Sequence, residues 1–155
     1  MQTIQARLQE QKIVIPQSPA PAANYVPYMI SRNHVFISGQ LPLVDGKLLH
    51  KGKVGQDVSL ETAREAARIC GLNVLGALQD ACHGDLDKVQ QCIRIGGFVN
   101  ATPDFVDHPK VINGVSDLMV EVFGLHSGHH SRVAVGCASL PLGACVEVEA
   151  LFYIR

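Results

Sequence analysis

The sequence predicts a domain of the α+β class, in which two helices pack on one face of a mixed β-sheet. Three observations lead to this prediction. Apolar residues recur at helical spacing in segments 60–82 and 109–123. A further β-type run, 88–99, lies between them, and paired β-type runs occur near both ends of the chain. The expected order is therefore ββ(β)-α-β-α-ββ.

Length and composition restrict the class of protein. The chain has 155 residues, of which 47% are hydrophobic and only 5% aromatic, so Val, Ile, Leu and Ala must build the core. The formal net charge of -1 gives no electrostatic footprint for nucleic acid or an anionic membrane surface. The sequence shows no apolar run long enough to span a bilayer and no signal-peptide core at its N-terminus. The odd number of cysteines, with no C-x-x-C spacing, predicts reduced and mostly buried thiols in a cytoplasmic protein.

The first 23 residues are expected to form a short helix and a connector. Residues 2–10 are the helix candidate. Segment 16–23 contains three of the eight prolines, and proline biases the chain toward extended structure. Because the residues before it are too few to bury a core, we expect 1–155 to be a single domain.

The next segment predicts two hairpins. The β-type runs 25–32 and 34–39 meet at a turn in which Asn33 tolerates positive φ. Asp45-Gly46, between apolar residues, is a second hairpin signal.

The clearest helix is predicted over 60–82. Ser59 is a suitable N-cap, and the apolar face is rich in small residues that allow close approach to a sheet. Gly71 and Gly76 lower helix propensity, so we expect packing to require them.

A strand over 88–99 follows, with Gly96-Gly97 as a candidate bulge. The second helix is predicted over 109–123 and is expected to stop at Gly124, leaving 125–130 as an exposed loop.

The closing stretch, residues 131–155, carries the candidate chemistry. Arg132 lies in one β-type run, and Glu147 and Glu149 share one face of the next run, because side chains alternate along a strand. On the expectation that the two runs are neighbouring strands, the arginine and the glutamates indicate a small anionic-ligand site.

One face of the predicted sheet lacks a cover, because the helices occupy only the other face. The residues expected there are not clearly polar, so association of several copies is the natural solution. The two sets considered are Val133, Val135 and Cys137, and Val89, Cys92 and Ile95.

Four stretches resemble the RidA/YjgF family, whose members are often labelled endoribonuclease L-PSP or reactive-intermediate deaminases. They are Asn24-Tyr25, FISGQLP (36–42), the helix after a VGQD-like loop, and SRVAVGCASLPLGACVEVEA (131–150). The resemblance runs from about Pro19 to the C-terminus. The loop at 124–130 and the stretch HPKVING look like those of a divergent subgroup.

The resemblance implies a chorismate-mutase-like fold and a homotrimer whose sheets form an inner barrel, with ligand clefts at the subunit interfaces. It also implies hydrolysis of enamines or imines, such as 2-aminoacrylate, to 2-keto acids and ammonia. The activity would be that of a 2-iminobutanoate/2-iminopropanoate deaminase-like hydrolase, with a small imino or keto acid as partner. Neither a metal nor an organic cofactor is implied.

Site residues follow from the same resemblance, position by position. Arg132 stands at the carboxylate-binding arginine, and Glu147 stands at the site glutamate, fifteen residues on. Central family members carry a cysteine two residues after the arginine, where this chain has Ala134. The implied site consists of Arg132 and Glu147 as catalytic residues, with Arg132, Tyr25, Ser38, Gly39 and Asn113 as substrate-binding residues.

Structural alternatives remain open at this point. Arg132 could pair with Glu147 or Glu149 across strands, and Ser38 could be only a strand-end hydrogen-bonding residue. Tyr25 could belong to the core, and Glu149 is expected to be structural or solvent-facing. The chain could also be a non-catalytic carboxylate-binding trimer, whereas a ribonuclease fits the charge poorly.

Histidines and the last two cysteines have ordinary interpretations. A solvated loop is favoured over a metal site for the histidines, since no carboxylate or cysteine ligand lies nearby in sequence. The residues are His126, His129 and His130, with Cys137 and Cys145 expected as buried small hydrophobic residues.

Overall fold

The computed structural model describes residues 1–18 and 24–155. Most of the predicted Pro-rich connector, residues 19–23, lies outside the described residues. The helices and strands follow in the order α1 (Ile4–Gln11), β1 (Tyr28–Ser31), β2 (His34–Gln40), β3 (Leu43–Val44), β4 (Lys47–Leu48), α2 (Leu60–Ala81), β5 (Val89–Asn100), α3 (His108–Gly128), β6 (Ser131–Cys137) and β7 (Val146–Ile154). Two short 3₁₀ turns complete them, η1 (Leu86–Lys88) and η2 (Pro141–Gly143).

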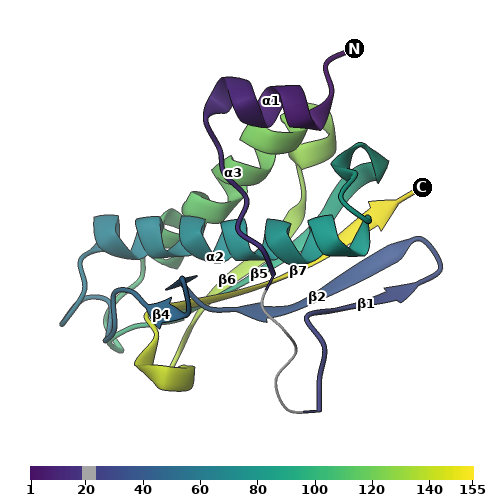
Figure 1. Cartoon of the computed structure of the whole chain (residues 1–155). Helices are drawn as coiled ribbons and strands as arrows, with labels where there is room; N and C mark the ends of the chain where they lie inside the picture. The colour runs from purple at the N-terminus through teal and green to yellow at the C-terminus, as the bar shows by residue number, and fades with distance from the viewer. Residues whose placement is uncertain (19–23) are drawn as a thin grey trace.

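The main sheet has five strands in the order β1-β2-β7-β5-β6, and β3 and β4 form a separate hairpin. The β5–β6 pairing is parallel and the other pairings are antiparallel, which confirms the mixed sheet. Helices α2 and α3 lie on one side of this sheet, and α1 packs over α3 (Figure 1). The helical layer therefore contains α2 and α3, as predicted, with α1 as a third helix outside it.

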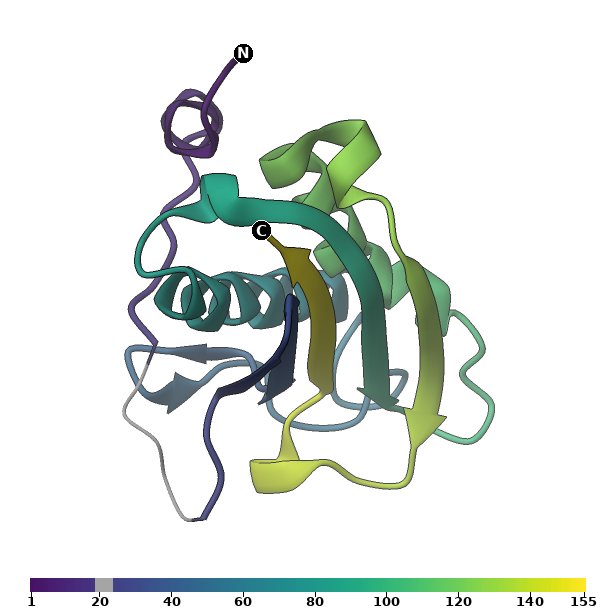
Figure 2. The same ribbon diagram turned by 90° about the vertical axis from the view of Figure 1, so that its right-hand side faces the viewer.

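The expectation that the two closing strands are neighbours is wrong. Strand β5 pairs with β6 on one side and with β7 on the other. Figure 2 shows β7 (gold), β5 (teal) and β6 (yellow-green) in this order across the sheet. The chain between β6 and β7, residues 138–145, crosses the end of β5 through η2, so it is a crossover and not a tight hairpin.

Strand β7 alternates between the two faces of the sheet as predicted. Val146, Val148 and Ala150 are buried under the helices, whereas Glu147 is half-buried and Glu149 is exposed. We call the face that carries the two glutamates the open face, because no described helix covers it.

The open face contains one of the two predicted residue sets. Cys92 and Ile95 are fully buried and Val89 is 8% exposed, and all three belong to the hydrophobic core, so their expected place on the open face is wrong. The second set lies on the open face as predicted. Arg132 of β6 points toward α3, and side chains alternate along a strand, so Val133 and Val135 point toward the open face. The mistake on β5 has a physical reason. Its register shifts near Gln90 and Ile93, which changes the alternation of its side chains.

Helix α2 confirms the prediction over 60–82 to within one residue. The hydroxyl of Ser59 accepts a hydrogen bond from the backbone N–H of Thr62, which caps the helix. A Cβ at Gly71 would meet Val115 of α3, and one at Gly76 would meet the carbonyl oxygen of Pro16. Both glycines therefore have the packing reason that the sequence suggested.

The predicted bulge at Gly96-Gly97 is wrong, because both glycines pair in register with β6 and β7. Glycine is required at these two positions for another reason, the close approach of other side chains. A Cβ at Gly97 would stand 2.5 Å from Ile112 of α3, and one at Gly96 would stand 2.8 Å from Glu149. Glycine here lets a helix and a side chain approach the sheet.

The second helix extends further than predicted. Gly124 interrupts α3 with φ 81° and ψ 170°, as its helix-stopping role suggested, but residues 125–128 form another helical turn rather than a loop. Only the two residues before β6 are irregular, which places His129 and His130 close to the end of the helix.

The opening hairpins are confirmed with two changes. Asp45 and Gly46 both have positive φ in the turn between β3 and β4. At the first turn the positive φ is found at Arg32 (55°) and not at Asn33, whose amide donates to the carbonyl of Ile154. Tyr25 lies before β1 rather than within it.

All five cysteines are free, and four of them are buried, as predicted; Cys137 is partly exposed. Among the described helices, none has the length and apolar character needed to cross a membrane.

Candidate functional site

Arg132 is held against α3 by neutral oxygen atoms. Its Nη1 donates to Oδ1 of Asn113 (2.8 Å) and to Oγ of Ser116 (3.1 Å), and Nη2 donates to the carbonyl of Pro109 (3.3 Å). The alternative in which Arg132 pairs with Glu147 or Glu149 is wrong, because the ion pairs of the described residues are those of His50, Arg68 and Lys110.

The guanidinium keeps donor capacity for a ligand. A guanidinium has five N–H groups, and the three hydrogen bonds to α3 occupy three of them. Within the described chain, Nε–H and one Nη2–H remain. Two N–H groups on one guanidinium can bind both oxygens of a carboxylate. Within the part of the chain that the structure describes, this positive charge has no carboxylate partner.

Ser116 and His130 form a hydrogen-bonded pair next to Arg132, to which Ser116 is bonded. Nε2 of His130 lies 2.8 Å from Oγ of Ser116, and Nδ1 lies 2.7 Å from the carbonyl oxygen of Gly128. The sequence prediction missed both residues. The only available signal was the run His129-His130-Ser131-Arg132, because Ser116 lies fourteen residues before its partner.

The interpretation of the three histidines as one solvated loop is therefore wrong for His130, which is half-buried and hydrogen-bonded. His126 and His129 are exposed. In the part of the chain that the structure describes, no three His, Cys, Asp or Glu side chains stand close enough to hold a metal ion.

Glu147 occupies a second cluster, on the open face beside β2. A Cβ on Gly39 would lie 2.6 Å from Oε2 of Glu147, so the missing side chain of Gly39 makes room for this carboxylate. The β2–β7 register shifts between Ile37 and Gln40, which places Ser38 and Gly39 in a bulge at this point. Burial raises the pKa of Glu147 above its ordinary value, and the nearby charge of Glu149 raises it further.

Ser38 lies beside this second cluster and binds the segment that follows Tyr25. The hydroxyl of Ser38 donates to the carbonyl of Val26 (2.7 Å), and its N–H donates to the carbonyl of Pro27 (2.9 Å). Ser38 thus fixes the segment that carries Tyr25, in keeping with the strand-end alternative. Tyr25 is 62% exposed, so its interpretation as a core residue is wrong.

The two clusters lie on opposite faces of the sheet. Arg132 stands level with Ile95 of β5 and therefore with Ala150 of β7, three residues from Glu147. Three residues along a strand and two strands across give a separation of roughly 14 Å between the two Cα atoms. The structure brings Arg132 together with Asn113, and Glu147 together with Gly39 and Ser38, but it does not bring these groups together within one chain.

Comparison with known proteins identifies the family. The family model described as "YjgF/chorismate_mutase-like, putative endoribonuclease" matches residues 5–153. The chain belongs to the YjgF family. Its fold is accordingly the chorismate-mutase-like α+β fold, with a mixed sheet and three helices.

Relatives of this YjgF protein match over nearly their whole length. Protein TCP17 of Trypanosoma cruzi is 43% identical over 148 residues, which are 96% of this chain and 92% of the relative. Protein HMF1 of Saccharomyces cerevisiae is 30% identical over 139 residues, 90% of this chain and 91% of the relative. The crystal structure of Atu1372 from Agrobacterium tumefaciens, of unknown function, is 43% identical with a TM-score of 0.91, covering 98% of this chain and 92% of that chain.

A thiol is present near Glu147, although not at the family position. Ala134 stands two residues after Arg132 on the helix-facing side of β6, whereas Cys137 lies on the open face at the end of the strand. Burial raises the pKa of Cys137, Lys53 opposes this effect, and the charge of Glu147 adds to it. Cys137 is thus not the buried hydrophobic residue that was predicted, while Cys145 is buried as expected.

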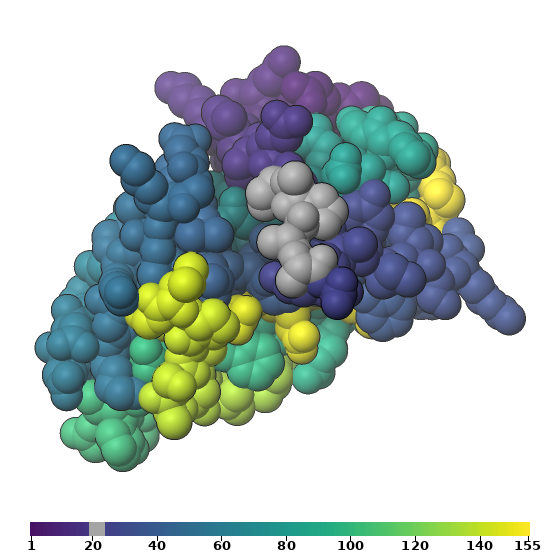
Figure 3. Space-filling model, turned by 60° about the horizontal axis from the view of Figure 1, so that its bottom comes forward, coloured from purple at the N-terminus to yellow at the C-terminus, as the bar shows by residue number. Residues whose placement is uncertain are grey.

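Polar contacts fix the crossover beside Cys137 in place. Nζ of Lys53 donates to Oδ1 of Asn100 (2.8 Å) and to the carbonyl of Ala138 (2.6 Å), and the amide of Asn100 donates to the carbonyl of Ala144. In Figure 3, this crossover (yellow-green) stands against the segment before α2 (blue), where the N–H of Gly52 donates to the carbonyl of Gly143. These contacts fix one border of the Glu147 cluster.

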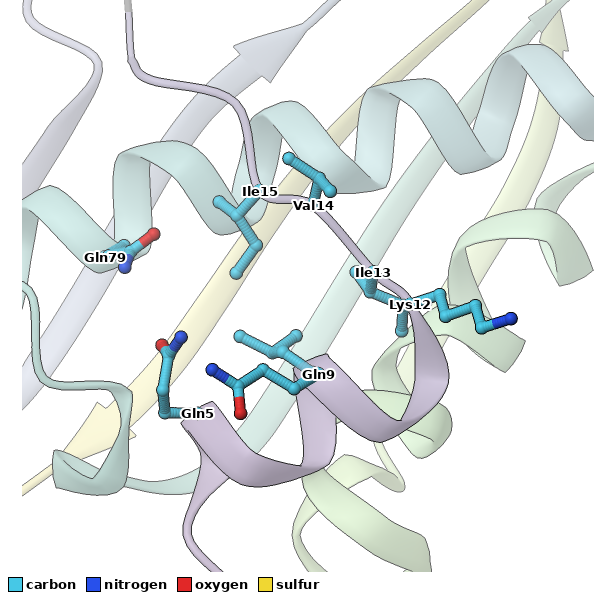
Figure 4. Close-up of a pocket in the computed structure, with 8 residues that line it drawn as sticks. Gln5, Gln9, Lys12, Ile13, Val14, Ile15 and Gln79 are labelled. Carbon is cyan, nitrogen blue, oxygen red and sulfur yellow. The ribbon is translucent and has the colours of Figure 1, made fainter.

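Two hollows in this YjgF protein lie outside both clusters. One, of about 190 Å³, is on the open face beside Glu149, which is exposed as expected, and Arg94. The other, of about 460 Å³, lies between α1, the extended segment after it and Gln79 of α2. Figure 4 shows the amides of Gln5 and Gln9 across from Gln79, with Ile13 and Ile15 beside them. Neither hollow contains a predicted site residue.

Proposed function

We propose that this protein hydrolyses small enamines or imines that carry a carboxylate, such as 2-aminoacrylate, to 2-keto acids and ammonia. The observation that carries the proposal is the surroundings of Arg132. Its guanidinium is oriented by three neutral oxygen atoms and, among the residues that the structure describes, has no carboxylate partner and keeps two unused N–H groups. A planar carboxylate fits this combination of charge and geometry.

The reaction needs water and a proton acceptor, but no redox partner. An enamine first gains a proton on carbon and loses one from nitrogen, which gives the imine. Water then adds its oxygen to the imine carbon, one water proton passes to the base, and the nitrogen is protonated. The nitrogen takes up a further proton, the C–N bond breaks and ammonia leaves, while the hydroxyl gives up the second water proton and the carbon becomes a ketone. Glu147 is the proposed base, because a raised pKa brings a carboxyl closer to the neutral range in which acid–base catalysis is efficient.

A complete site requires two copies of the chain in this proposal. Arg132 and Glu147 lie on opposite faces and roughly 14 Å apart, too far for one small substrate to touch both within one chain. A ring of copies solves this problem if Arg132 at the sheet edge of one copy meets Glu147 of the next. We therefore propose a homotrimer whose open faces form an inner barrel, with Tyr25, Ser38 and Gly39 beside Glu147 at each interface.

Exposed apolar side chains on the open face support this assembly. Phe36 is 49% exposed, and Val135 and Tyr153 are each 40% exposed. An apolar surface of this kind is typical of a buried interface between protein chains.

The alternative is a trimer that binds carboxylates without catalysis. Ala134 favours it, because the thiol that central family members carry at this position is absent. A ribonuclease remains a poor fit, since the net charge is -1 and aromatic residues make up 5% of the chain.

A coupled assay distinguishes these functions. An amino-acid dehydratase or oxidase generates 2-aminoacrylate or a longer imine in solution, and loss of the imine is followed with and without this protein. We expect acceleration by wild type, loss of it in Arg132→Ala and Glu147→Gln, and retention in Arg94→Ala and Glu149→Gln, which change the same residue types elsewhere on the sheet.

Two other results would lead to different conclusions. If wild type accelerates the loss of none of the imines but binds 2-oxobutanoate through Arg132, the protein binds carboxylates without catalysis. If Glu147→Gln keeps full activity, Glu147 takes no part in the chemistry and Arg132 acts only as the anchor for the carboxylate.

A further inference from the structure

A directed chain of hydrogen bonds begins at Arg132 and ends at the carbonyl of Gly128. The carbonyl of Gly128 can only accept, so Nδ1 of His130 must carry a proton. In the neutral ring Nε2 is then an acceptor, and the hydroxyl of Ser116 donates to it at 2.8 Å. This leaves a lone pair of Ser116 for the Nη1–H of Arg132 at 3.1 Å. Each group has one role, and the order is Arg132 to Ser116 to His130 to Gly128.

Among the described residues, Arg132 and His129 are the ionisable groups whose charge acts on His130. From α3 it meets the neutral groups Ser116 and Gly128, and from β6 it meets Arg132. His129 precedes it, and Arg94, opposite Ser131 on β5, lines the hollow on the open face. Burial lowers the pKa of His130, the hydrogen bond to Gly128 opposes this, and Arg132 and His129 lower it further.

A bound carboxylate changes this balance. It brings a negative charge to Arg132, which has no anionic partner among the described residues. The repulsion between Arg132 and a protonated His130 is then offset. The protonated ring still reaches the same groups, because Nε2–H donates to Oγ of Ser116 while Ser116 keeps a second lone pair for Arg132.

We propose that Ser116 and His130 are positioning residues for the Arg132 anchor, and that His130 takes up a proton when a carboxylate binds to Arg132. This inference rests on the proposed function, because it takes Arg132 as the carboxylate site. Linkage fixes the direction: if the anion favours the protonated ring, the protonated ring favours the anion by the same factor. Carboxylate affinity therefore rises as the pH falls through the titration of His130.

Calorimetry of 2-oxobutanoate binding tests the proton uptake. Binding to the full-length protein is measured near pH 6 in two buffers with different heats of ionisation, and the affinity is followed from pH 8 to pH 5.5. The carboxylate of the ligand stays ionised throughout this range. Wild type should take up part of a proton per site and bind more tightly at low pH. His130→Gln should do neither, and His129→Gln, a change of the adjacent exposed histidine, should behave like wild type.

Substitution of Ser116 tests the positioning role. Ser116→Ala should weaken carboxylate binding roughly threefold to tenfold, the usual net effect of one hydrogen bond. Ser116→Thr, which keeps the hydroxyl, should restore it. Thermal unfolding of each variant identifies any that do not fold, and His130→Asn serves as the second histidine substitution.

The results separate this inference from the proposed function. If wild type binds the ligand with no proton uptake and no pH dependence, or if Ser116→Ala binds as wild type does, the inference is wrong and the proposed function stands. If wild type binds no carboxylate, both are wrong.

Discussion

Glu147 and Glu149 are two residues apart on β7, yet their surroundings differ. Each carboxylate lies over a glycine: Glu147 over Gly39 of β2, and Glu149 over Gly96 of β5. Only Glu147 is half-buried beside Ser38, while Glu149 is exposed. This difference supports a chemical role for Glu147. It also makes Gly96, beside Glu149, the control position for Gly39, beside Glu147.

Substitution of these glycines should separate the two glutamates. Gly39→Ala would displace Oε2 of Glu147, from which its Cβ would be 2.6 Å away. The displaced atom ends a flexible side chain, so stability should change little while imine hydrolysis falls about tenfold to a hundredfold. Gly96→Ala would meet Cγ of Glu149 at 2.8 Å and Oε1 at 2.9 Å, and should leave hydrolysis near the wild-type rate. Equal losses in both variants would contradict the assignment.

The raised pKa of Glu147 should also affect stability. The pKa of Glu147 is higher in the folded chain than in the unfolded chain. Its contribution to the free energy of unfolding is therefore fully present at a pH below the pKa of the unfolded chain, and is lost as the pH rises through the pKa of the folded chain. Glu147→Gln should therefore gain in unfolding free energy relative to wild type between about pH 4 and pH 7, as measured by urea denaturation. Glu149→Gln should reduce this pH dependence without abolishing it, since burial is the larger cause. A constant difference across this range would contradict the shift.

At the scale of elements, the close packing of α3 on the sheet depends on Gly97. Ile112 lies where a Cβ on Gly97 would be, with its Cδ1 only 2.5 Å away. Asn113 follows Ile112 on α3, and Arg132 lies on β6, which pairs with β5 alongside Gly97. This packing is therefore part of the site's framework.

Gly97→Ala should destabilise the protein by about 1–3 kcal/mol, the usual effect of overpacking a core. The double variant Gly97→Ala/Ile112→Val, which removes one methyl group from the contact, should recover part of this loss in a chemical denaturation experiment. If Ile112→Val raised the stability of the wild-type protein by the same amount, the contact between residue 97 and Ile112 would not be the cause.

The sequence predicted the elements well where the signal is local. Helix α2 was found from its apolar spacing and the Ser59 cap, and the β3–β4 turn from Asp45-Gly46. Signals that depend on distant partners were misread. Gly96-Gly97 looked like a bulge, but these residues are small because Ile112 and Glu149 approach from other elements.

The same limit applies to the site. Arg132, Glu147, Gly39 and Asn113 were named through a family resemblance, and Asn113 does contact Arg132. Ser116 was missed, because its contacts with Arg132 and His130 exist only after α3 folds against β6.

At the scale of the whole molecule, strand order decides how the site is built. The run that carries Arg132 and the run that carries Glu147 looked like neighbours, because only a short turn separates them in sequence. The parallel pairing of β5 with β6 places β5 between them. A single chain thus separates the two residues that the proposed chemistry needs together.

The open face should be the surface that joins the copies. Phe36→Asp places a charge at a side chain that is 49% exposed on this face. We expect this variant to sediment as a smaller species than wild type, and to lose imine hydrolysis with the assembly. Val14→Asp, at an apolar residue that is 81% exposed beside α1, is the control and should keep the wild-type mass. A monomeric wild type at micromolar concentration would contradict the proposed trimer.

Subunit mixing tests the two-copy site most directly. Arg132→Ala and Glu147→Gln are each expected to be inactive alone. When the two variants are denatured and refolded together, random trimers contain interfaces that join an intact Arg132 to an intact Glu147, at roughly a quarter of all sites. We expect the mixture to recover about that fraction of wild-type imine hydrolysis, whereas a mixture as inactive as its two components would contradict a site shared between copies.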